Sequence, residues 1–181
     1  DMQDNKPSSR EIDRCINRIA EGDETALEQL YDLTSSAVFA YALSLTRNRF
    51  DAEDVMHDCF VKVYESAAQY KSHGKPMAWM LTIAKNMCYQ RFNQNKRFAD
   101  VKDEDIERMF GDNGSVNADD RMMLKACLSQ LTAVERQIVV MHAVGGMKHR
   151  EIADMLGIPL STTLSKYNRA LDKLKNMIGA N

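Results

Sequence analysis

Apolar residues recur at helical spacing along most of this chain, and this periodicity constrains the fold more than any other feature of the sequence. Apolar side chains that repeat every three or four residues lie on one face of a helix and form a buried stripe. Glycine and proline, the residues that most often interrupt helices, number only 8 and 3 among 181 residues. We therefore predict an all-α protein.

Four periodic stretches in the first part of the chain predict one compact helical domain, which we place at residues 1–98. The first stretch opens with a capping box at Ser8–Glu11, in which side chains satisfy the free N–H groups of a helix start. Asp23 can cap the second helix in the same manner. We expect the third helix to open at Asp51, and the fourth to follow a loop at residues 71–76.

The periodicity lapses after residue 98 and returns about twenty residues later. Residues 101–120 hold seven acidic and two basic residues and include the turn-forming sequence GDNGS. We predict a flexible acidic linker at residues 99–118. A second small helical domain, with a helix-turn-helix, is predicted at residues 119–181.

The composition argues against a secreted, membrane-spanning or catalytic protein. No apolar run approaches the ~20 residues that a membrane helix needs, and no signal-peptide pattern opens the chain, so we expect a cytoplasmic protein. The four cysteines are far apart in the sequence, and we expect free, buried thiols. Since the sequence has no nucleophile–base pair, phosphate loop or metal-ligand cluster, we predict no catalytic residue, cofactor or metal.

Residues 148–171 predict a helix-turn-helix, the motif that places a helix in the major groove of DNA. Ala153 is the small residue that two crossing helices need, and Gly157 suits a turn that requires a positive φ. An inward stripe that includes Thr163 and Leu174 leaves the opposite face of the second helix to meet DNA. The predicted duplex-binding residues on and beside that face are Ser161, Thr162, Leu164, Ser165, Lys166, Asn168 and Arg169.

These side chains have a chemistry suited to base edges and phosphates. Asn168 can pair with adenine, Arg169 and Lys166 can reach phosphate or guanine, and Leu164 can touch a thymine methyl group. The alternative is that this helix only closes a bundle. A module with so few cations should bind DNA weakly, because affinity rises with the phosphates neutralised, so it needs a dimer partner or a second anchor.

The second anchor is predicted in residues 71–99, which hold six basic residues and no acidic one. Cations interleaved with aromatic rings suit single-stranded or melted nucleic acid, and a basic loop between helices can capture a flipped base. For Trp79 alone, a position in the core is the competing interpretation. The predicted strand-binding residues are Tyr70, Lys71, Ser72, His73, Lys75, Trp79, Lys85, Asn86, Tyr89 and Arg91.

The third helix presents a different, mainly acidic surface. Its carboxylates would repel DNA, so we expect this face to meet water or a basic protein partner. A metal or hydrolytic site is the alternative, but the carboxylates lack convergent histidine or cysteine ligands. The residues of this predicted docking face are Asp51, Glu53, Asp54, His57, Asp58 and Lys62.

Together these segments resemble a bacterial sigma factor of the extracytoplasmic-function (ECF) type. Residues 51–70 resemble the region 2 helix that docks on the clamp helices of RNA polymerase. Residues 75–92 resemble the promoter-melting segment, and residues 131–174 resemble region 4. The melting segment has four residues at motif positions: Trp79, Ile83, Ala84 and Asn86.

The resemblance implies that the chain confers promoter recognition on core RNA polymerase, which it contacts at the clamp helices and the flap. Region 4 would bind the −35 element as duplex, and region 2 would open the −10 element. A flipped non-template base would enter the loop at Lys71–Lys75. The acidic linker would run toward the RNA exit path of the polymerase. An anti-sigma protein would hold the chain inactive, and the chain itself would not insert into a membrane.

The chain departs from the family pattern at positions that bear on DNA contacts. Thr163 and Leu164 replace a valine and a cation that are common there, and Gln90, Asn93 and Gln94 replace an acid and two arginines. These changes predict an altered promoter preference and weak DNA binding without core polymerase. Two alternatives remain: a stand-alone helix-turn-helix repressor or activator, and an interaction protein that occupies polymerase without promoter recognition.

Overall fold

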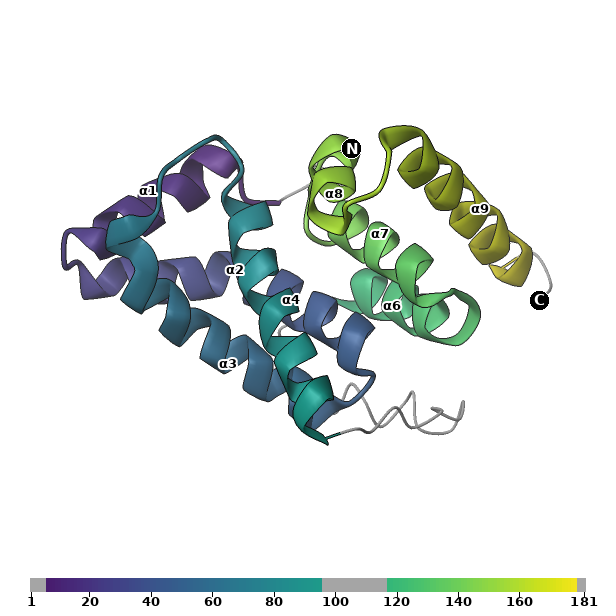
Figure 1. Cartoon of the computed structure of the whole chain (residues 1–181), viewed down its shortest axis with the longest axis horizontal. Coiled ribbons are helices and arrows are strands. Elements are labelled where there is room, and N and C mark those ends of the chain that lie inside the picture. Colours follow the sequence, from purple (N-terminus) through teal and green to yellow (C-terminus); the bar gives the residue numbers. More distant parts are fainter. Residues whose placement is uncertain (1–5, 96–116, 179–181) are drawn as a thin grey trace.

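The structure is a computed structural model that describes residues 6–95 and 117–178, and its helices form two groups (Figure 1). The first group comprises α1 (Ser9–Ala20), α2 (Glu24–Thr46), α3 (Arg49–Ser66), the 3₁₀ helix η1 (Ala67–Gln69) and α4 (Pro76–Asn95). The second comprises α6 (Ala118–Gln130), α7 (Ala133–Ala143), α8 (His149–Leu156) and α9 (Leu160–Ile178). Within these two ranges no strand forms, and the predicted all-α class is confirmed. The predicted linker lies outside the described residues except at its last two positions.

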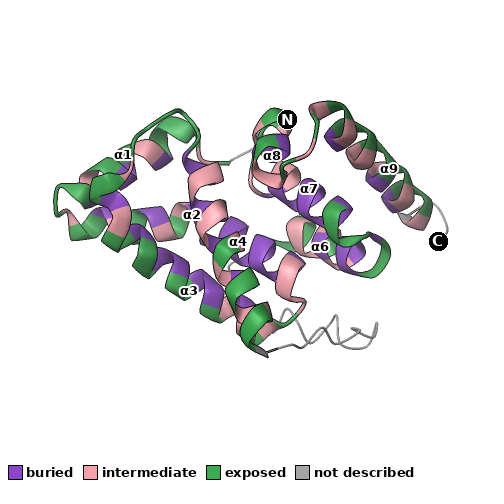
Figure 2. Cartoon of the chain, in the orientation of Figure 1, coloured by how far each residue is buried: buried purple, intermediate pink, exposed green. Residues whose placement is uncertain are grey.

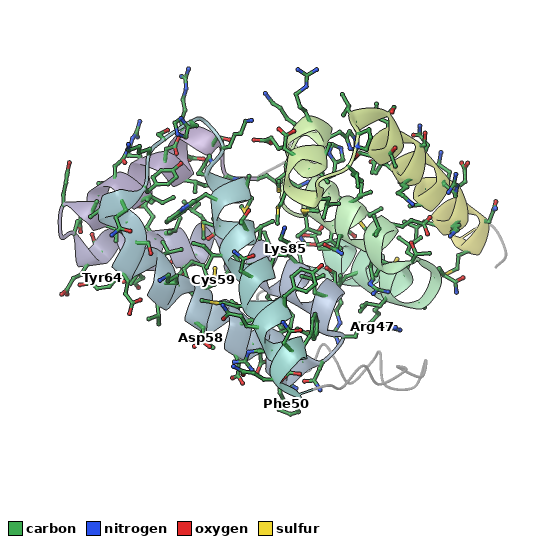
Figure 3. All side chains as sticks on the ribbon, in the orientation of Figure 1. Arg47, Phe50, Asp58, Cys59, Tyr64 and Lys85 are labelled. Atoms are coloured by element: carbon green, nitrogen blue, oxygen red, sulfur yellow. The ribbon has the colours of Figure 1, made fainter. Side chains whose placement is uncertain are left out.

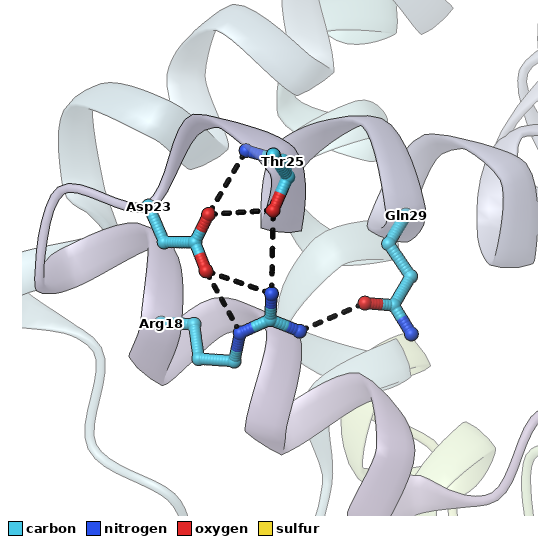
Figure 4. Close-up of polar contacts among 4 residues, drawn as sticks. All are labelled: Arg18, Asp23, Thr25 and Gln29. Atoms are coloured by element: carbon cyan, nitrogen blue, oxygen red, sulfur yellow. Dashed lines mark hydrogen bonds and ion pairs between the residues drawn. The ribbon is translucent and has the colours of Figure 1, made fainter.

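Polar side chains fix the junction between α1 and α2. Asp23 caps α2 by accepting a hydrogen bond from the Thr25 backbone N–H at 3.0 Å, and its other carboxylate oxygen binds Arg18 at 2.7 Å and 3.1 Å (Figure 4). The same guanidinium donates to Gln29 Oε1 at 2.8 Å. Hydrogen bonds from Thr25 and then Arg18 lower the pKa of Asp23 to about 2, so the cap stays ionised. The predicted capping box at Ser8–Glu11 is also confirmed.

The start of α3 corrects one prediction. Asn48, and not Asp51, lies at the head of this helix, because the Asn48 side chain accepts a hydrogen bond from the Asp51 backbone N–H at 3.0 Å. The helix therefore begins at Arg49, and Asp51 lies within its first turn. Arg47 ends α2 in the left-handed region, with a φ of 51°, so two residues suffice to connect the helices.

The second half of α2 forms the centre of the molecule. Every residue from Ala37 to Ser44 is buried, although a helix on the surface would bury only one stripe (Figure 2). One side of α2 packs against α1, α3 and α4, and the other side packs against α7 and α6. The two groups of helices therefore share a continuous apolar core.

Hydrogen bonds also cross between the two groups. Tyr41 donates from its hydroxyl to Gln137 Oε1 at 3.2 Å, and Lys85 Nζ donates to the Met155 carbonyl at 3.0 Å. Arg136 is 6% exposed, and its guanidinium donates to the main-chain carbonyl of Ser44 at 2.9 Å. Burial, and then the positive charge of Arg47, lowers the pKa of Arg136 to about 10. This contact between the groups therefore buries a charged side chain.

All four cysteines are free and buried, as predicted. Burial raises the pKa of Cys59, Cys88 and Cys127 to about 12, so these thiols stay protonated and unreactive. None of the helices in the described ranges is both long and apolar enough to span a membrane. Across the same ranges, no group of three or more His, Cys, Asp or Glu residues is placed to hold a metal ion.

Candidate nucleic-acid interfaces and the face of α3

Residues 70–75 form the loop between η1 and α4, and α1 holds this loop at two points. The Tyr70 hydroxyl donates a hydrogen bond to one carboxylate oxygen of Asp13, and Ser72 Oγ donates to the other at 2.8 Å. The Tyr70 ring lies 4.6 Å from the Trp79 ring, tilted by 46°. Pro76 begins α4, where the N–H that proline lacks would have no helical partner.

A cavity of about 370 Å³ lies beside this aromatic pair. Its walls include Lys71, His73 and Lys75 from the loop, and Glu151 and Asp154 from α8. Lys75 Nζ lies 3.9 Å from a carboxylate oxygen of Asp154, so the two groups of helices meet at this cavity. Trp79 is half-buried: it packs against the core and also lines the cavity, so its two competing interpretations are compatible.

The other predicted strand-binding residues are not all in the same surroundings. Asn86 and Tyr89 are exposed on α4 beyond the loop. Lys85 is half-buried and donates to Met155, while Arg91 lies at the acidic side of α3. The structure thus brings Tyr70 and Trp79 together with the basic loop, and gives Lys85 and Arg91 partners in the protein.

The acidic residues of α3 are partly neutralised by α4. The Arg91 guanidinium lies 3.7 Å from the Asp51 carboxylate, 3.5 Å from that of Asp54 and 3.3 Å from that of Asp58. Asp54 and Asp58 remain mostly exposed, and Figure 3 shows Asp58 on the outer side of α3 while Cys59 turns inward. The three aspartates of this face therefore share one arginine, whereas Glu53 pairs with Arg49 at 3.0 Å.

Sequence reasoning missed the apolar part of the same face. Val61 and Tyr64 are 56% and 53% exposed, and Tyr64 projects from the outer end of α3 (Figure 3). With Tyr31 and Phe60 they line an open groove of about 640 Å³ between α2 and α3, where the Tyr31 and Phe60 rings lie 5.0 Å apart. The sequence does indicate this apolar surface, because Val61 and Tyr64 are apolar residues at positions outside the buried stripe of α3.

The predicted helix-turn-helix consists of α8 and α9. Gly157 has a φ of 66° and caps α8, and the Ile158 N–H donates to the Ala153 carbonyl at 3.1 Å. Thr163, which is fully buried, donates from its hydroxyl to the Pro159 carbonyl at 3.1 Å. The predicted need for a positive φ at Gly157 is confirmed.

The predicted duplex-binding residues mostly lie on the outer face of α9. Ala170 and Leu174 are buried and Tyr167 is half-buried, which confirms the predicted inward stripe as far as Leu174. Thr162 and Lys166 are half-buried at the edge of the outer face. The exposed members of the set are Ser161, Leu164, Ser165, Asn168 and Arg169.

A histidine pair, which sequence reasoning also missed, joins α7 to α8. The rings of His142 and His149 stack with centroids 4.1 Å apart, and the Tyr167 ring lies 4.4 Å from His149. His149 Nδ1 is buried and has no hydrogen-bond partner among the described residues. Burial, and then the proximity of His142, lowers the pKa of His149, so the stack favours neutral imidazole.

Each group of helices contains a segment that matches a known family. The family described as Sigma-70 region 2 matches residues 30–98, and the family described as Sigma-70, region 4 matches residues 121–174. The ECF RNA polymerase sigma factor SigK of Mycobacterium tuberculosis (strain ATCC 25618 / H37Rv) is 27% identical over 178 residues, covering 94% of this chain and 95% of that protein. SigK of Mycobacterium ulcerans (strain Agy99) is 25% identical over 179 residues, covering 95% and 96%.

Solved structures share the fold. CnrH in complex with the cytosolic domain of CnrY superposes with a TM-score of 0.66 at 21% identity, covering 94% of this chain and 99% of that one. The sigma factor RpoE of Bartonella quintana, in complex with the anti-sigma factor NepR, gives a TM-score of 0.62 at 21% identity. That comparison covers 85% of this chain and 97% of RpoE.

Proposed function

We propose how this chain, which belongs to the ECF sigma factors and so directs core RNA polymerase to promoters, divides promoter recognition among its surfaces. The loop at 70–75 takes a base of the melted −10 element, α9 binds the −35 element as duplex, and α3 docks on the polymerase. The observation that carries this proposal is the Tyr70–Trp79 pair beside an exposed basic loop.

The loop suits an unpaired strand because it combines aromatic faces with exposed cations. A base can stack on an aromatic ring, and Lys71 and Lys75 can neutralise the phosphates on either side. Asp154 of α8 lies beside Lys75, so a phosphate that approached Lys75 would compete with the Asp154 carboxylate for the ammonium group. We therefore propose that α8 moves away from the loop when promoter DNA enters.

The outer face of α9 suits duplex DNA because a straight helix carries its polar side chains into a major groove. Asn168 and Arg169 would contact base edges, and Lys166 would contact phosphate. With so few cations the domain binds weakly alone, so the polymerase and the −10 contacts supply the remaining affinity.

The outer face of α3 suits a protein partner because its apolar side chains are bordered by charged ones, as in many interfaces. We propose that Val61 and Tyr64 contact the clamp helices together with the predicted docking residues, and that the second group of helices contacts the flap. Work of this kind needs no catalytic site in the chain itself, and it takes place in the cytoplasm with the polymerase.

Regulation by an anti-sigma protein is part of the proposal. RpoE of Bartonella quintana was solved in complex with the anti-sigma factor NepR, and the structural match covers 85% of this chain. We propose that a protein of this class sequesters this chain as well.

The test is in vitro transcription with core polymerase on genomic fragments, followed by mapping of start sites. We expect starts that depend on this protein and that share sequence at two separated promoter elements. Absence of any protein-dependent start would sink the proposal, and tight binding of the protein alone to a palindromic duplex would favour a stand-alone regulator.

Docking is tested separately by reversing charge on α3. The double variant Asp54→Lys/Asp58→Lys would surround Arg91 with like charge, so we expect weaker assembly with core polymerase in a competition assay. Glu21→Lys, which reverses an exposed carboxylate at the end of α1 that does not line the groove, serves as a control for added positive charge. Normal binding of the double variant would show that the acidic side of α3 takes no part in docking.

A further inference from the structure

We propose that Asp13, on α1, is a positioning residue that holds the loop at 70–75 in the shape that receives a melted promoter base. The inference rests on the proposed function of that loop and extends it to Asp13, which precedes both matched family regions, at residues 30–98 and 121–174. Asp13 would not touch DNA, and would act through the two hydroxyl groups that it binds.

The geometry is that of one carboxylate shared by two loop side chains. One oxygen of Asp13 accepts from the Tyr70 hydroxyl, and the other accepts from Ser72 Oγ at 2.8 Å. The two donors flank Lys71, so both ends of this short segment are tied to α1. Hydrogen bonds to an ionised acceptor are stronger than neutral ones, which makes the carboxylate an effective anchor.

Asp13 also sets the position of the aromatic pair. A fixed hydroxyl group fixes the ring that carries it, and the Tyr70 ring lies 4.6 Å from that of Trp79. Burial, and then the hydrogen bond to Asp13, raises the pKa of Tyr70, so the phenol stays protonated and remains a donor. The surface on which a base would stack is therefore prepared before DNA arrives.

The rest of the loop does little to hold itself in place. Residues 71–75 are all exposed, and Gly74 has a φ of 74°. An exposed loop of this kind would have to be ordered when a base binds, and that ordering lowers affinity unless it is already complete. Preorganisation by Asp13 removes that cost.

The sign of the charge separates positioning from direct binding. A carboxylate beneath a basic loop opposes phosphate, so electrostatics alone predicts tighter DNA binding when Asp13 is neutralised. The positioning role predicts the opposite for the captured base. If neutralising Asp13 weakens base capture although it removes a negative charge, neither the change in charge nor a general loss of affinity accounts for the result.

The experiment uses holoenzyme and single-stranded non-template oligonucleotides that span the −10 element of a mapped promoter. Each oligonucleotide is intact or carries one abasic position. For the wild-type protein we expect one abasic position to lower affinity on the order of tenfold, as stacking of one base would. For Asp13→Ala we expect that difference to shrink to less than about threefold, because the stacking surface is no longer fixed.

Glu21→Ala is the matched control, since it removes an exposed carboxylate at the end of the same helix. We expect it to keep the wild-type discrimination. If Asp13→Ala discriminates as well as the wild type, the role of Asp13 is wrong while the function of the loop stands. If the wild type itself does not discriminate at any position, the proposed function of the loop fails, and the role of Asp13 fails with it.

Two further variants keep the inference testable if Asp13→Ala does not fold. Ser72→Ala removes one exposed donor and should reduce the discrimination partway, and Tyr70→Phe removes the other donor but keeps the ring. Because the two donors share the Asp13 carboxylate, the double variant Tyr70→Phe/Ser72→Ala should lose as much discrimination as is expected of Asp13→Ala. Wild-type discrimination by this double variant would overturn the inference.

Discussion

The loop at 70–75 and the outer face of α9 both serve nucleic acid in our proposal, but they are built in different ways. The face of α9 needs only a straight helix, whose inner side is fixed by Thr163, Ala170 and Leu174. The loop has irregular backbone, and one side chain of α1, Asp13, holds it at two points. A helix can present side chains to a duplex with no further support, whereas capture of a single base requires a pocket that other elements shape.

Trp79→Ala tests the loop most severely. The variant removes a stacking surface worth about 1–3 kcal/mol per base, so we expect transcription and −10 strand binding to fall by about fivefold to about 150-fold. Duplex binding by α9 should change little. The measurement is holoenzyme affinity for single-stranded and duplex probes, with thermal unfolding to show that the variant is folded, since Trp79 is half-buried. Equal losses on both probes would erase the distinction between the two surfaces.

Asn168→Ala and Arg169→Ala test the other surface. Each removes a base contact of about 1–3 kcal/mol, so each should lower promoter use several-fold to about a hundredfold. Assembly with core polymerase and binding to the −10 single strand should be unchanged. Lys175→Ala, an exposed cation farther along α9, is the control. An effect of Asn168→Ala on the single strand would show that the two surfaces do not act separately.

The difference between the surfaces also explains what the sequence could predict. Helical periodicity, the capping box at Ser8–Glu11 and the turn at Gly157 are local signals, and the structure confirms them. The anchor on Asp13 joins residues 57 and 59 positions apart, and no local pattern reports such a pair. The all-round burial of α2 was missed for the same reason, because it depends on a second group of helices that packs from the other side.

The apolar part of the α3 face was missed for a different reason. The docking face was predicted from its charged residues, such as Asp54 and Asp58. Val61 and Tyr64 are apolar, but they lie at outward positions of the same helix. The residue at which a helix begins was also predicted less accurately than the presence of the helix. Arg49 precedes the predicted start of α3 by two residues because Asn48 supplies the cap.

Acid should affect the two regions differently. The pKa of His149 is lowered in the folded protein, so the unfolded chain binds this proton more readily. Stability of α7–α9 should therefore fall as the pH drops below the unfolded value of 6.5, and continue to fall until the folded pKa is passed. Hydrogen exchange along the full chain measures this, and the loop at 70–75 should be less affected.

His149→Phe is the matched variant, because it keeps a ring against His142 and Tyr167 and removes the titrating group. We expect the pH dependence of α8 exchange in this range to weaken. If the dependence is unchanged, protonation of the histidine stack does not control the stability of the helix-turn-helix.

Leu164→Lys should have the smallest effect, and it tests how far α9 depends on its partners. Leu164 is 40% exposed on the outer face of α9, where a cation could reach a phosphate. One added phosphate contact should make the salt dependence of duplex binding steeper by about 0.9 in log–log slope. Affinity for the −10 single strand should stay the same. Titration of holoenzyme on −35 duplexes at several salt concentrations measures both the slope and any change in preferred sequence. A steeper slope on the duplex alone would show that α9 can gain affinity without help from the loop. The small number of cations on α9 would then reflect the support that the polymerase gives, and not a limit of the helix itself.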